Sequence, residues 1–176
     1  MDPAADLSAW LHRVTFADLT TDQVTARLID EVAIWAAGHG WRVYRRAASV
    51  VRLPPPMQDR HSVLDVACAR PDGPPLAIEV DHTDRRRTVE KLIAEAGAGR
   101  VPIWVRWGTG GFREPPAPVR MVTVSVTRRA HLNSRHPDLP PPRHGQGFAN
   151  AEPQTLLTPG PVDHGVGSDE TDKSSL

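Results

Sequence analysis

The sequence predicts an α/β domain over about residues 7 to 130, with a mixed central sheet flanked by helices. Two stretches, 20–37 and 84–96, carry apolar residues at helical spacing. Short runs rich in valine and isoleucine, typical of strands, lie between and after them. After Val126 proline, glycine, histidine and acidic residues dominate. We therefore expect one domain and a disordered tail over residues 131–176.

The first elements are helical. Apolar residues from Leu7 to Val14 recur at helical spacing, which predicts a short helix within a lead-in of residues 1–19. Thr20 and Gln23 then form a capping-box pattern, and an apolar stripe runs from there to Gly38. We expect this second helix to begin the core domain, residues 20–130.

Three strands are expected next. Residues 41–53 suit a strand that ends at three prolines, and the apolar runs 62–69 and 75–81 are joined by a turn-rich segment typical of a β-hairpin. Both runs are apolar on both faces, which places them centrally in a covered sheet.

Asp84 is expected to cap the next helix, whose buried stripe would be Val89, Leu92, Ile93 and Ala96. Strands over 101–107 and 119–126 complete the domain. Because a helix connects them, the third and fourth strands should be parallel neighbours. The predicted core consists of Trp35, Leu64, Val66, Ile78, Val80, Leu92 and Ile103.

Charge and cysteine content limit the partners. The net charge is zero, but residues 1–132 hold 18 of the 21 basic and 15 of the 21 acidic residues. Such a small excess permits nucleic-acid contact, although dedicated binders show a stronger bias. Cys68 is the sole cysteine and is read as a core residue. Without a leader-like or membrane-spanning run, a cytoplasmic location with no membrane contact is expected.

Three carboxylates interrupt the apolar strands. Glu79 and Asp81 share one face of their strand because side chains alternate, and hairpin pairing can bring Asp65 beside them. Such a cluster suits a hard cation, Mg²⁺ or Mn²⁺. Three solvated acids near strand ends are the alternative. Glu31 lies on the apolar face of its helix, so it either reaches past the sheet edge or enters the same site.

This order of helix, three strands, helix and strand, with Asp65 and Glu79 on the second and third strands, resembles the αβββαβ core of the PD-(D/E)XK, or restriction-endonuclease-like, superfamily. The resemblance covers about residues 20 to 126, and the run 79–91 is similar to that of uncharacterised actinobacterial members. It implies that Asp65 and Glu79 bind the metal, with Glu31 and Asp81 as further ligands. It also implies a lysine two residues after the Glu, which positions or activates the attacking water.

Asp81 occupies the place of that lysine, and an acidic side chain cannot donate to the water. Helical angle places Lys91 opposite the apolar stripe, in solvent. Arg85 falls near the inward side of the same helix, so it is the expected substitute for the missing lysine. The alternative is that Arg85, too, faces solvent. The catalytic set predicted from sequence is therefore Asp65, Glu79, Asp81 and Arg85.

Other polar features are assigned smaller roles. The glycine-rich run 108–111 leads to prolines and no helix start, which argues against a phosphate-cradling loop. His61 is too far along its strand from Asp65 to act with it, and His82 is read as structural or exposed. Arginines at positions 45, 46, 52, 86 and 87 are candidate phosphate contacts.

Three functions remain from sequence alone. The first is a Mg²⁺- or Mn²⁺-dependent nuclease acting on DNA or RNA phosphodiesters, with impaired or lost catalysis if no cation replaces the missing lysine. The second is a non-catalytic nucleic-acid or protein-binding module on the same fold. The third, an unrelated α/β interaction domain, holds if the acids lie far apart.

Overall fold

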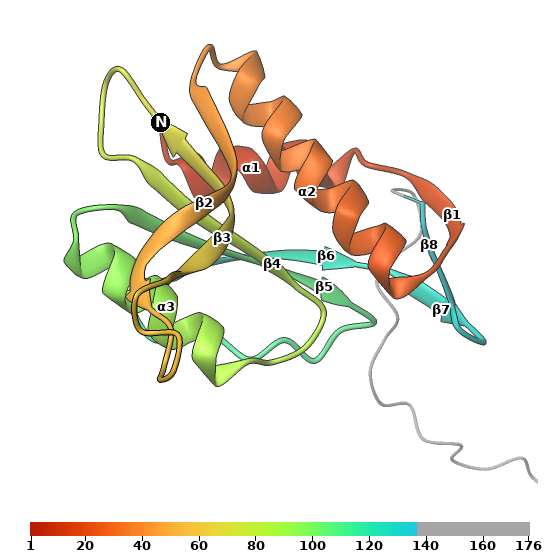
Figure 1. Cartoon of the computed structure of the whole chain (residues 1–176). Coiled ribbons are helices and arrows are strands. Elements are labelled where there is room, and N and C mark those ends of the chain that lie inside the picture. The colour runs from red at the N-terminus through yellow and green to blue at the C-terminus, as the bar shows by residue number, and fades with distance from the viewer. Residues whose placement is uncertain (137–176) are drawn as a thin grey trace, which may run out of the picture. The chain divides into compact units, whose positions relative to one another are not determined.

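The computed structural model describes residues 1–136 and is a mixed α/β fold (Figure 1). Within these residues the elements are α1 (Pro3–His12), β1 (Phe16–Leu19), α2 (Thr21–Gly38), β2 (Arg42–Arg52), β3 (His61–Ala69), β4 (Leu76–Asp81), α3 (Arg86–Gly97), β5 (Val101–Gly108), β6 (Arg120–Ser125), β7 (Thr127–Arg129) and β8 (Leu132–Arg135). None of the helices in this part of the chain is both long and apolar enough to cross a bilayer.

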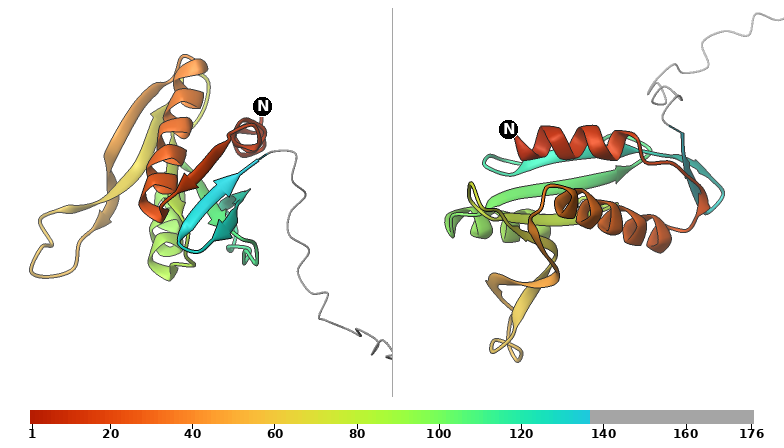
Figure 2. Two further views of the ribbon diagram at one scale, coloured as in Figure 1. Left: turned by 90° about the vertical axis from the view of Figure 1, so that its right-hand side faces the viewer. Right: turned by 90° about the horizontal axis from the view of Figure 1, so that it is seen from above.

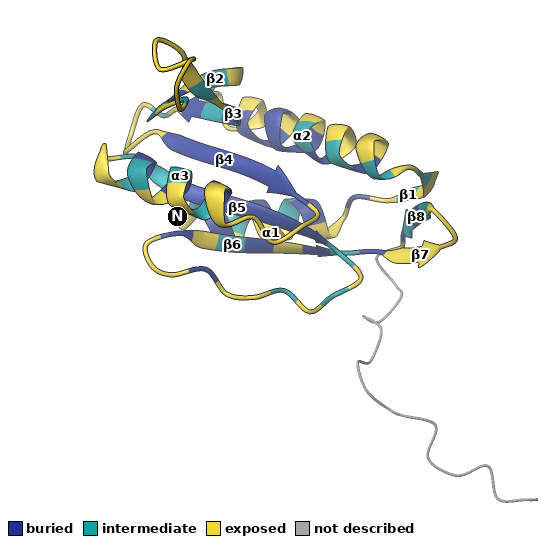
Figure 3. Cartoon of the chain, turned by 60° about the horizontal axis from the view of Figure 1, so that its bottom comes forward, coloured by how far each residue is buried: buried dark blue, intermediate teal, exposed yellow. Residues whose placement is uncertain are grey.

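A five-stranded mixed sheet with the order β2-β3-β4-β5-β6 forms the centre. The predicted hairpin is confirmed, since β3 and β4 pair antiparallel with Val66 opposite Ile78. The predicted parallel neighbours are confirmed too, because β4 and β5 pair in parallel with Ile78 opposite Ile103. Strand β4 lies in the middle and is buried along its whole length (Figure 3). The carboxyl ends of β4 and β5 therefore lie side by side.

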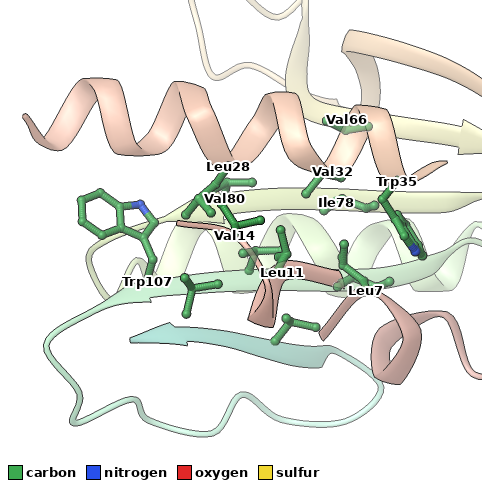
Figure 4. Packing of buried hydrophobic residues seen from close by; sticks show 14 of the residues in the cluster. Leu7, Leu11, Val14, Leu28, Val32, Trp35, Val66, Ile78, Val80 and Trp107 are labelled. Carbon is green, nitrogen blue, oxygen red and sulfur yellow. The ribbon is translucent and has the colours of Figure 1, made fainter. Parts of the chain in front are cut away.

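Each face of the sheet carries its own apolar cluster. Helices α1 and α2 pack on one face, where Leu7, Leu28 and Ile78 belong to the larger cluster (Figures 2 and 4). Helix α3 covers the other face, where Leu92 and Trp104 belong to a smaller cluster. All seven residues predicted for the core are at most 3% exposed, and Cys68 is buried as expected.

Local signals explain where α2 begins and ends. The Thr20 side chain accepts from the Gln23 backbone N–H, and the Gln23 side chain accepts from the Thr20 N–H, so the predicted capping box is present. Gly40, just past the end of α2, has a φ of 74°, which glycine adopts at little cost.

The structured part extends beyond the predicted core domain, residues 20–130, at both ends. Helix α1 is part of the main core, because Leu7 and Leu11 are buried in it. At the other end β8 pairs antiparallel with β1 and with β7, although no structure was expected from residue 131. The buried positions of β8 are Asn133 and Arg135, which bond to backbone carbonyls of earlier segments. Strand β8 has no apolar periodicity because the side chains it buries are polar and have partners far away in the sequence. Residues 137–176 of the predicted tail lie outside the residues that the structure describes.

Helix α3 also differs from expectation. Its N-cap is Arg85 and not Asp84, and no side chain caps it. The residues it buries are Thr88, Leu92 and Glu95, whereas Ile93 is 39% exposed. The apolar stripe predicted from sequence is therefore rotated around the helix axis from the true inward face, because two of the three buried side chains are polar.

Candidate functional site

A cleft of about 900 Å³ opens at the carboxyl end of β4, between the amino-terminal halves of α2 and α3 and the β2–β3 hairpin. Three of the predicted acids, Asp65, Glu79 and Asp81, line it together. Ligands of open α/β sheets bind at the carboxyl ends of strands, so the position is typical of a functional site. The third sequence hypothesis required these acids to lie far apart, and the shared cleft argues against it.

A distortion of the hairpin aims Asp65 into the cleft. Opposite it on β2, Arg46 has a φ of 51°, in the left-handed region. On either side of Asp65, Leu64 joins the α3 cluster whereas Val66 joins the α2 cluster. Strict alternation would place both on one face, so β3 twists sharply here. The Asp65 carboxylate accepts a 2.8 Å hydrogen bond from the Val80 backbone N–H, which holds it beside β4.

The central contact of the cleft joins Glu79 to Lys91. Lys91 Nζ lies 2.6 Å from Glu79 Oε1, and the two side chains are only 12% and 8% exposed. Nζ also donates a 2.7 Å hydrogen bond to the Val63 carbonyl. The Glu79–Lys91 contact is therefore a largely buried ion pair. The prediction that Lys91 points into solvent is wrong.

Burial dominates the electrostatics of the two inner carboxylates. It raises the pKa of Glu79 from its ordinary 4.5 to about 7, against the lowering effect of Lys91 and with small additions from Asp65 and Asp81. Burial also raises the pKa of Asp65, which the Val80 N–H opposes and the Asp81 charge reinforces. Carboxylates with raised pKa values in a cleft are typical of functional sites.

The Glu79 pKa predicts how stability depends on pH in the metal-free protein. Between pH 4.5 and 7 the native state binds more protons at Glu79 than the unfolded state, so the free energy of unfolding should fall as pH rises. Glu79→Gln removes this titration, and the wild type should lose up to about 3 kcal/mol relative to the variant across that range. Denaturant unfolding in EDTA at pH 4.5, 5.5, 6.5 and 7.5 measures it. Glu90→Gln, at an exposed acid of the same cleft, should keep the wild-type slope; parallel curves for Glu79→Gln and wild type would contradict the prediction.

Asp81 holds the site together and is poorly placed to be a free ligand. Its Oδ2 accepts 3.0 Å hydrogen bonds from the Thr88 hydroxyl and from the Trp104 indole N–H. The first of these ties the opening turn of α3 to the end of β4. Since Lys91 lies one helical turn beyond Thr88, this bond helps to place Lys91 over Glu79.

Two other predicted site residues do not contact Asp65 or Glu79. Glu31 is buried, but it accepts from the Trp10 indole N–H, pairs with Arg27 at 2.7 Å and does not line the cleft. It therefore joins α2 to α1, and its prediction as a metal ligand is wrong. Arg85 lines the cleft, yet its side chain is 60% exposed and its Nε is 3.6 Å from Asp81 Oδ1. Lys91, and not Arg85, is the cation in contact with Glu79.

Of the arginines considered as phosphate contacts, Arg52 and Arg87 line the cleft. Arg45 pairs with Asp30 and Arg86 with Glu90, away from the inner acids. His61 bonds to the Ser49 carbonyl, as expected for a residue outside the site, whereas the exposed His82 lies on the cleft wall.

The donor set suits a hard divalent cation in part. No group of three or more His, Cys, Asp or Glu side chains within residues 1–136 is arranged to hold a metal ion. Mg²⁺, however, is commonly bound by one or two carboxylates and keeps several waters. Asp65 and Glu79 meet that number because both line the cleft, although Lys91 Nζ lies 2.6 Å from Glu79 Oε1, so a metal ion at that oxygen would share or displace the contact.

The sequence does contain a pattern that predicts an inward-facing Lys91, but the pattern includes polar residues and is missed when only apolar residues are considered. Thr88, Lys91, Leu92 and Glu95 follow the spacing i, i+3, i+4, i+7 of a single helix face. Glu95 is fully buried and bonds to Ser49, Val50 and Arg100. A helix face read by its polar residues as well as its apolar ones would have pointed Lys91 inward.

Comparison with known proteins adds no relative: no protein-family model, no curated protein and no solved structure matches this chain. The geometry of the cleft is therefore the basis for a functional assignment.

Proposed function

We propose that this protein is a divalent-metal-dependent nuclease of the PD-(D/E)XK type, acting on DNA or RNA phosphodiesters, in which Lys91 supplies the basic group from α3. The observation that carries the proposal is the placement of Lys91 Nζ 2.6 Å from Glu79 Oε1, in the cleft that Asp65 also lines. This cation removes the main objection raised by the sequence, where an aspartate stands at the usual lysine position.

The order of elements supports the same assignment. Helix α2, strands β2, β3 and β4, helix α3 and strand β5 follow one another as in the αβββαβ core, with Asp65 on the second strand and Glu79 on the third. Asp81 stands two residues after Glu79, and its bond to Thr88 anchors the helix that carries Lys91. In this proposal the basic group comes from α3, the element that follows β4, and still lies in the same cleft.

Each group has a role that follows from its position. Asp65 and Glu79 would hold Mg²⁺ or Mn²⁺, which supplies a Lewis acid and a water of lowered pKa when bound. Lys91 would orient a water at Glu79 and offset negative charge that develops on the phosphate. Arg52 and Arg87, on the cleft wall, are available to neighbouring phosphates of the substrate.

One observation favours a second candidate, a non-catalytic nucleic-acid or protein-binding module. The Lys91 ammonium contacts Glu79 Oε1, the carboxylate oxygen that a metal would need. In this alternative the Glu79–Lys91 pair is structural, and neither Mg²⁺ nor Mn²⁺ binds in the cleft.

Metal-dependent thermal stability tests the site and separates the two candidates. A ligand at about 100 times its Kd stabilises by about 2.7 kcal/mol if it binds only the native state, so saturating Mn²⁺ should raise Tm by roughly 5 to 10 °C. Asp65→Ala and Glu79→Gln should abolish the shift, because each removes one of the two proposed ligands.

Glu90→Gln serves as the control, since it removes an exposed acid from the same cleft and should retain the shift. Each Tm is compared with that of the same variant in EDTA, which cancels changes in intrinsic stability. A shift that persists in both Asp65→Ala and Glu79→Gln would refute the metal site. A wild type with no shift would favour the binding module.

A further inference from the structure

A groove of about 470 Å³ lies between α1 and the carboxyl-terminal end of α2, which we call the α1–α2 groove. Its volume falls within the roughly 300 to 1,000 Å³ of typical ligand sites. Trp10 is partly buried and lines the groove together with the buried Trp35. His39 lines it as well, and its ring stacks on that of Trp41. The lining of the groove is therefore strongly aromatic.

Hydrogen bonds between the two helices hold the walls of the α1–α2 groove in place. Trp10 Nε1 donates to Glu31 Oε2 at 3.1 Å, and Trp35 Nε1 donates to Asp6 Oδ2 at 2.7 Å. His39 Nε2 lies 2.7 Å from the same Asp6 oxygen. Both indole N–H groups are thus used within the protein, and the groove offers a ligand mainly aromatic carbon surface. A preformed groove of this kind spares a ligand the cost of ordering its walls.

Opposite charges mark the two ends of the α1–α2 groove. Arg13, the exposed C-cap residue of α1, lies over the Trp10 ring at 4.9 Å from its centroid. Asp6, whose side chain is 30% exposed, lies seven residues earlier, about 10 Å along the helix at 1.5 Å per residue. The groove therefore presents a cation near the end of α1 and a carboxylate toward its start.

The described part of the chain ends beside Arg13. Strand β1 leads away from the end of α1, and β8 pairs antiparallel with β1, so β8 runs back toward α1 (Figure 2). Arg135, the last residue of β8, donates a 3.2 Å hydrogen bond from Nη2 to the His12 carbonyl. The residues that follow β8 therefore start at the cationic end of the groove.

The sequence that follows β8 suits an aromatic groove. Residues 137–143 read Pro-Asp-Leu-Pro-Pro-Pro-Arg. Consecutive prolines favour the extended polyproline II helix, and proline-rich segments bind aromatic-lined grooves because they lose little entropy on binding. Asp138 and Arg143 would be about 15 Å apart in this conformation, at 3.1 Å per residue. Entering beside Arg13, the segment brings Asp138 to Arg13 first and Arg143 toward Asp6 next, so the charges are complementary in order.

We propose that the α1–α2 groove binds residues 137–143 of the same chain. Asp138 follows Arg135 by three residues, and an extended chain of that length covers about 10 Å, which reaches from β8 to the end of α1. A tethered segment acts at an effective concentration on the order of 1 mM, so an intrinsic Kd of about 0.1 mM keeps it bound about ten times as often as free. The tail expected to be disordered would then begin after Arg143.

A spin label just beyond the segment tests the proposal in the full-length, metal-free protein. The label is attached at His144→Cys in a Cys68→Ala background, since Cys68 is the sole native cysteine. The indole N–H signals of Trp10 and Trp35 should be broadened beyond detection by nuclear magnetic resonance. The signal of Trp104, which packs with the α3 cluster on the opposite face of the sheet, should be broadened far less. Equal broadening of all three signals, or none, would overturn the proposal.

Replacing prolines shows whether the proline-rich segment is responsible for the broadening. Pro140→Gly/Pro142→Gly makes the backbone flexible and removes two rings, so the Trp10 and Trp35 signals should recover. Pro159→Gly/Pro161→Gly is the matched control, because it removes two prolines at the same spacing farther along the chain and should leave the broadening unchanged. Signals that stay broadened in the first variant would contradict the assignment of the segment.

A charge exchange tests the orientation of the bound segment. Arg13→Glu places like charges opposite each other and should lower the ratio of bound to free segment by about three- to tenfold. Combining it with Asp138→Arg should restore the broadening, whereas Arg113→Glu, at an exposed arginine of another loop, should behave like wild type. A double exchange that behaves like Arg13→Glu alone would overturn the proposed pairing.

Mixing two samples separates binding within one chain from exchange between two copies. Spin-labelled chains at natural isotope abundance are combined with isotope-labelled chains that lack the spin label. Binding within the chain predicts no broadening in the mixture, and broadening there would assign the groove to the segment of a second copy. The proposal does not depend on the nuclease assignment, since none of these measurements involves the cleft or a metal ion.

Discussion

Replacing Lys91 with methionine is expected to reduce metal-dependent cleavage by about 100-fold or more, the range found when a positioned proton donor or acceptor is removed. Lys91 is the cation in contact with Glu79, and methionine keeps much of its length while removing the charge. The metal-dependent rise in Tm should remain, because the proposed ligands Asp65 and Glu79 are intact. Single-turnover cleavage in Mn²⁺, on the substrate that wild type cleaves best among single- and double-stranded DNA and RNA, measures the effect.

Arg85→Met is the matched control for this experiment. The Arg85 side chain is 60% exposed, and its one ion pair, with Asp81, is long at 3.6 Å. The loss of Arg85 should therefore lower cleavage by less than about threefold. If Arg85→Met is the variant that loses activity while Lys91→Met cleaves normally, the assignment of the basic group is wrong. Absence of cleavage by wild type on all four substrates would favour the binding module.

Glu95→Ala is expected to destabilise the fold by about 3 to 5 kcal/mol, the cost of removing one partner from a buried charged network. Glu95 is fully buried; its Oε1 accepts from the Ser49 hydroxyl at 2.5 Å and from the Val50 N–H at 2.8 Å. Its Oε2 pairs with Arg100 at 2.6 Å. The substitution leaves these donors without their acceptor and loosens the contact between α3 and β2. Denaturant unfolding at constant pH measures the change in midpoint.

Glu90→Ala provides the comparison on the same helix. Glu90 is exposed and pairs with Arg86 on the surface, so its removal should change the free energy of unfolding by less than about 0.5 kcal/mol. A loss below about 1 kcal/mol in Glu95→Ala would show that solvent or nearby groups satisfy the released donors, and that the network contributes little to the fold.

The candidate site was only partly predictable, and the reason differs from residue to residue. Asp65 and Glu79 stand out because charged residues inside apolar strands are rare, and hairpin pairing constrains their neighbours. Lys91 was misplaced because its helix face was read from apolar residues alone, whereas Thr88 and Glu95 are buried through partners on β4 and β2. Glu31 was misassigned because its partner, Trp10, lies on a helix that the predicted core did not include.

The sequence by itself determined the local elements of this protein: the capped helix α2, the hairpin of β3 and β4, the crossover to β5 and the apolar core residues. These depend on side-chain periodicity and on short turns, which neighbouring residues carry. Only the tertiary structure decided which polar side chains are buried, that β8 returns to β1, and that Lys91 and not Arg85 meets Glu79. A buried polar residue is stabilised by a partner distant in the chain, and hydrophobic patterning contains no information about that partner.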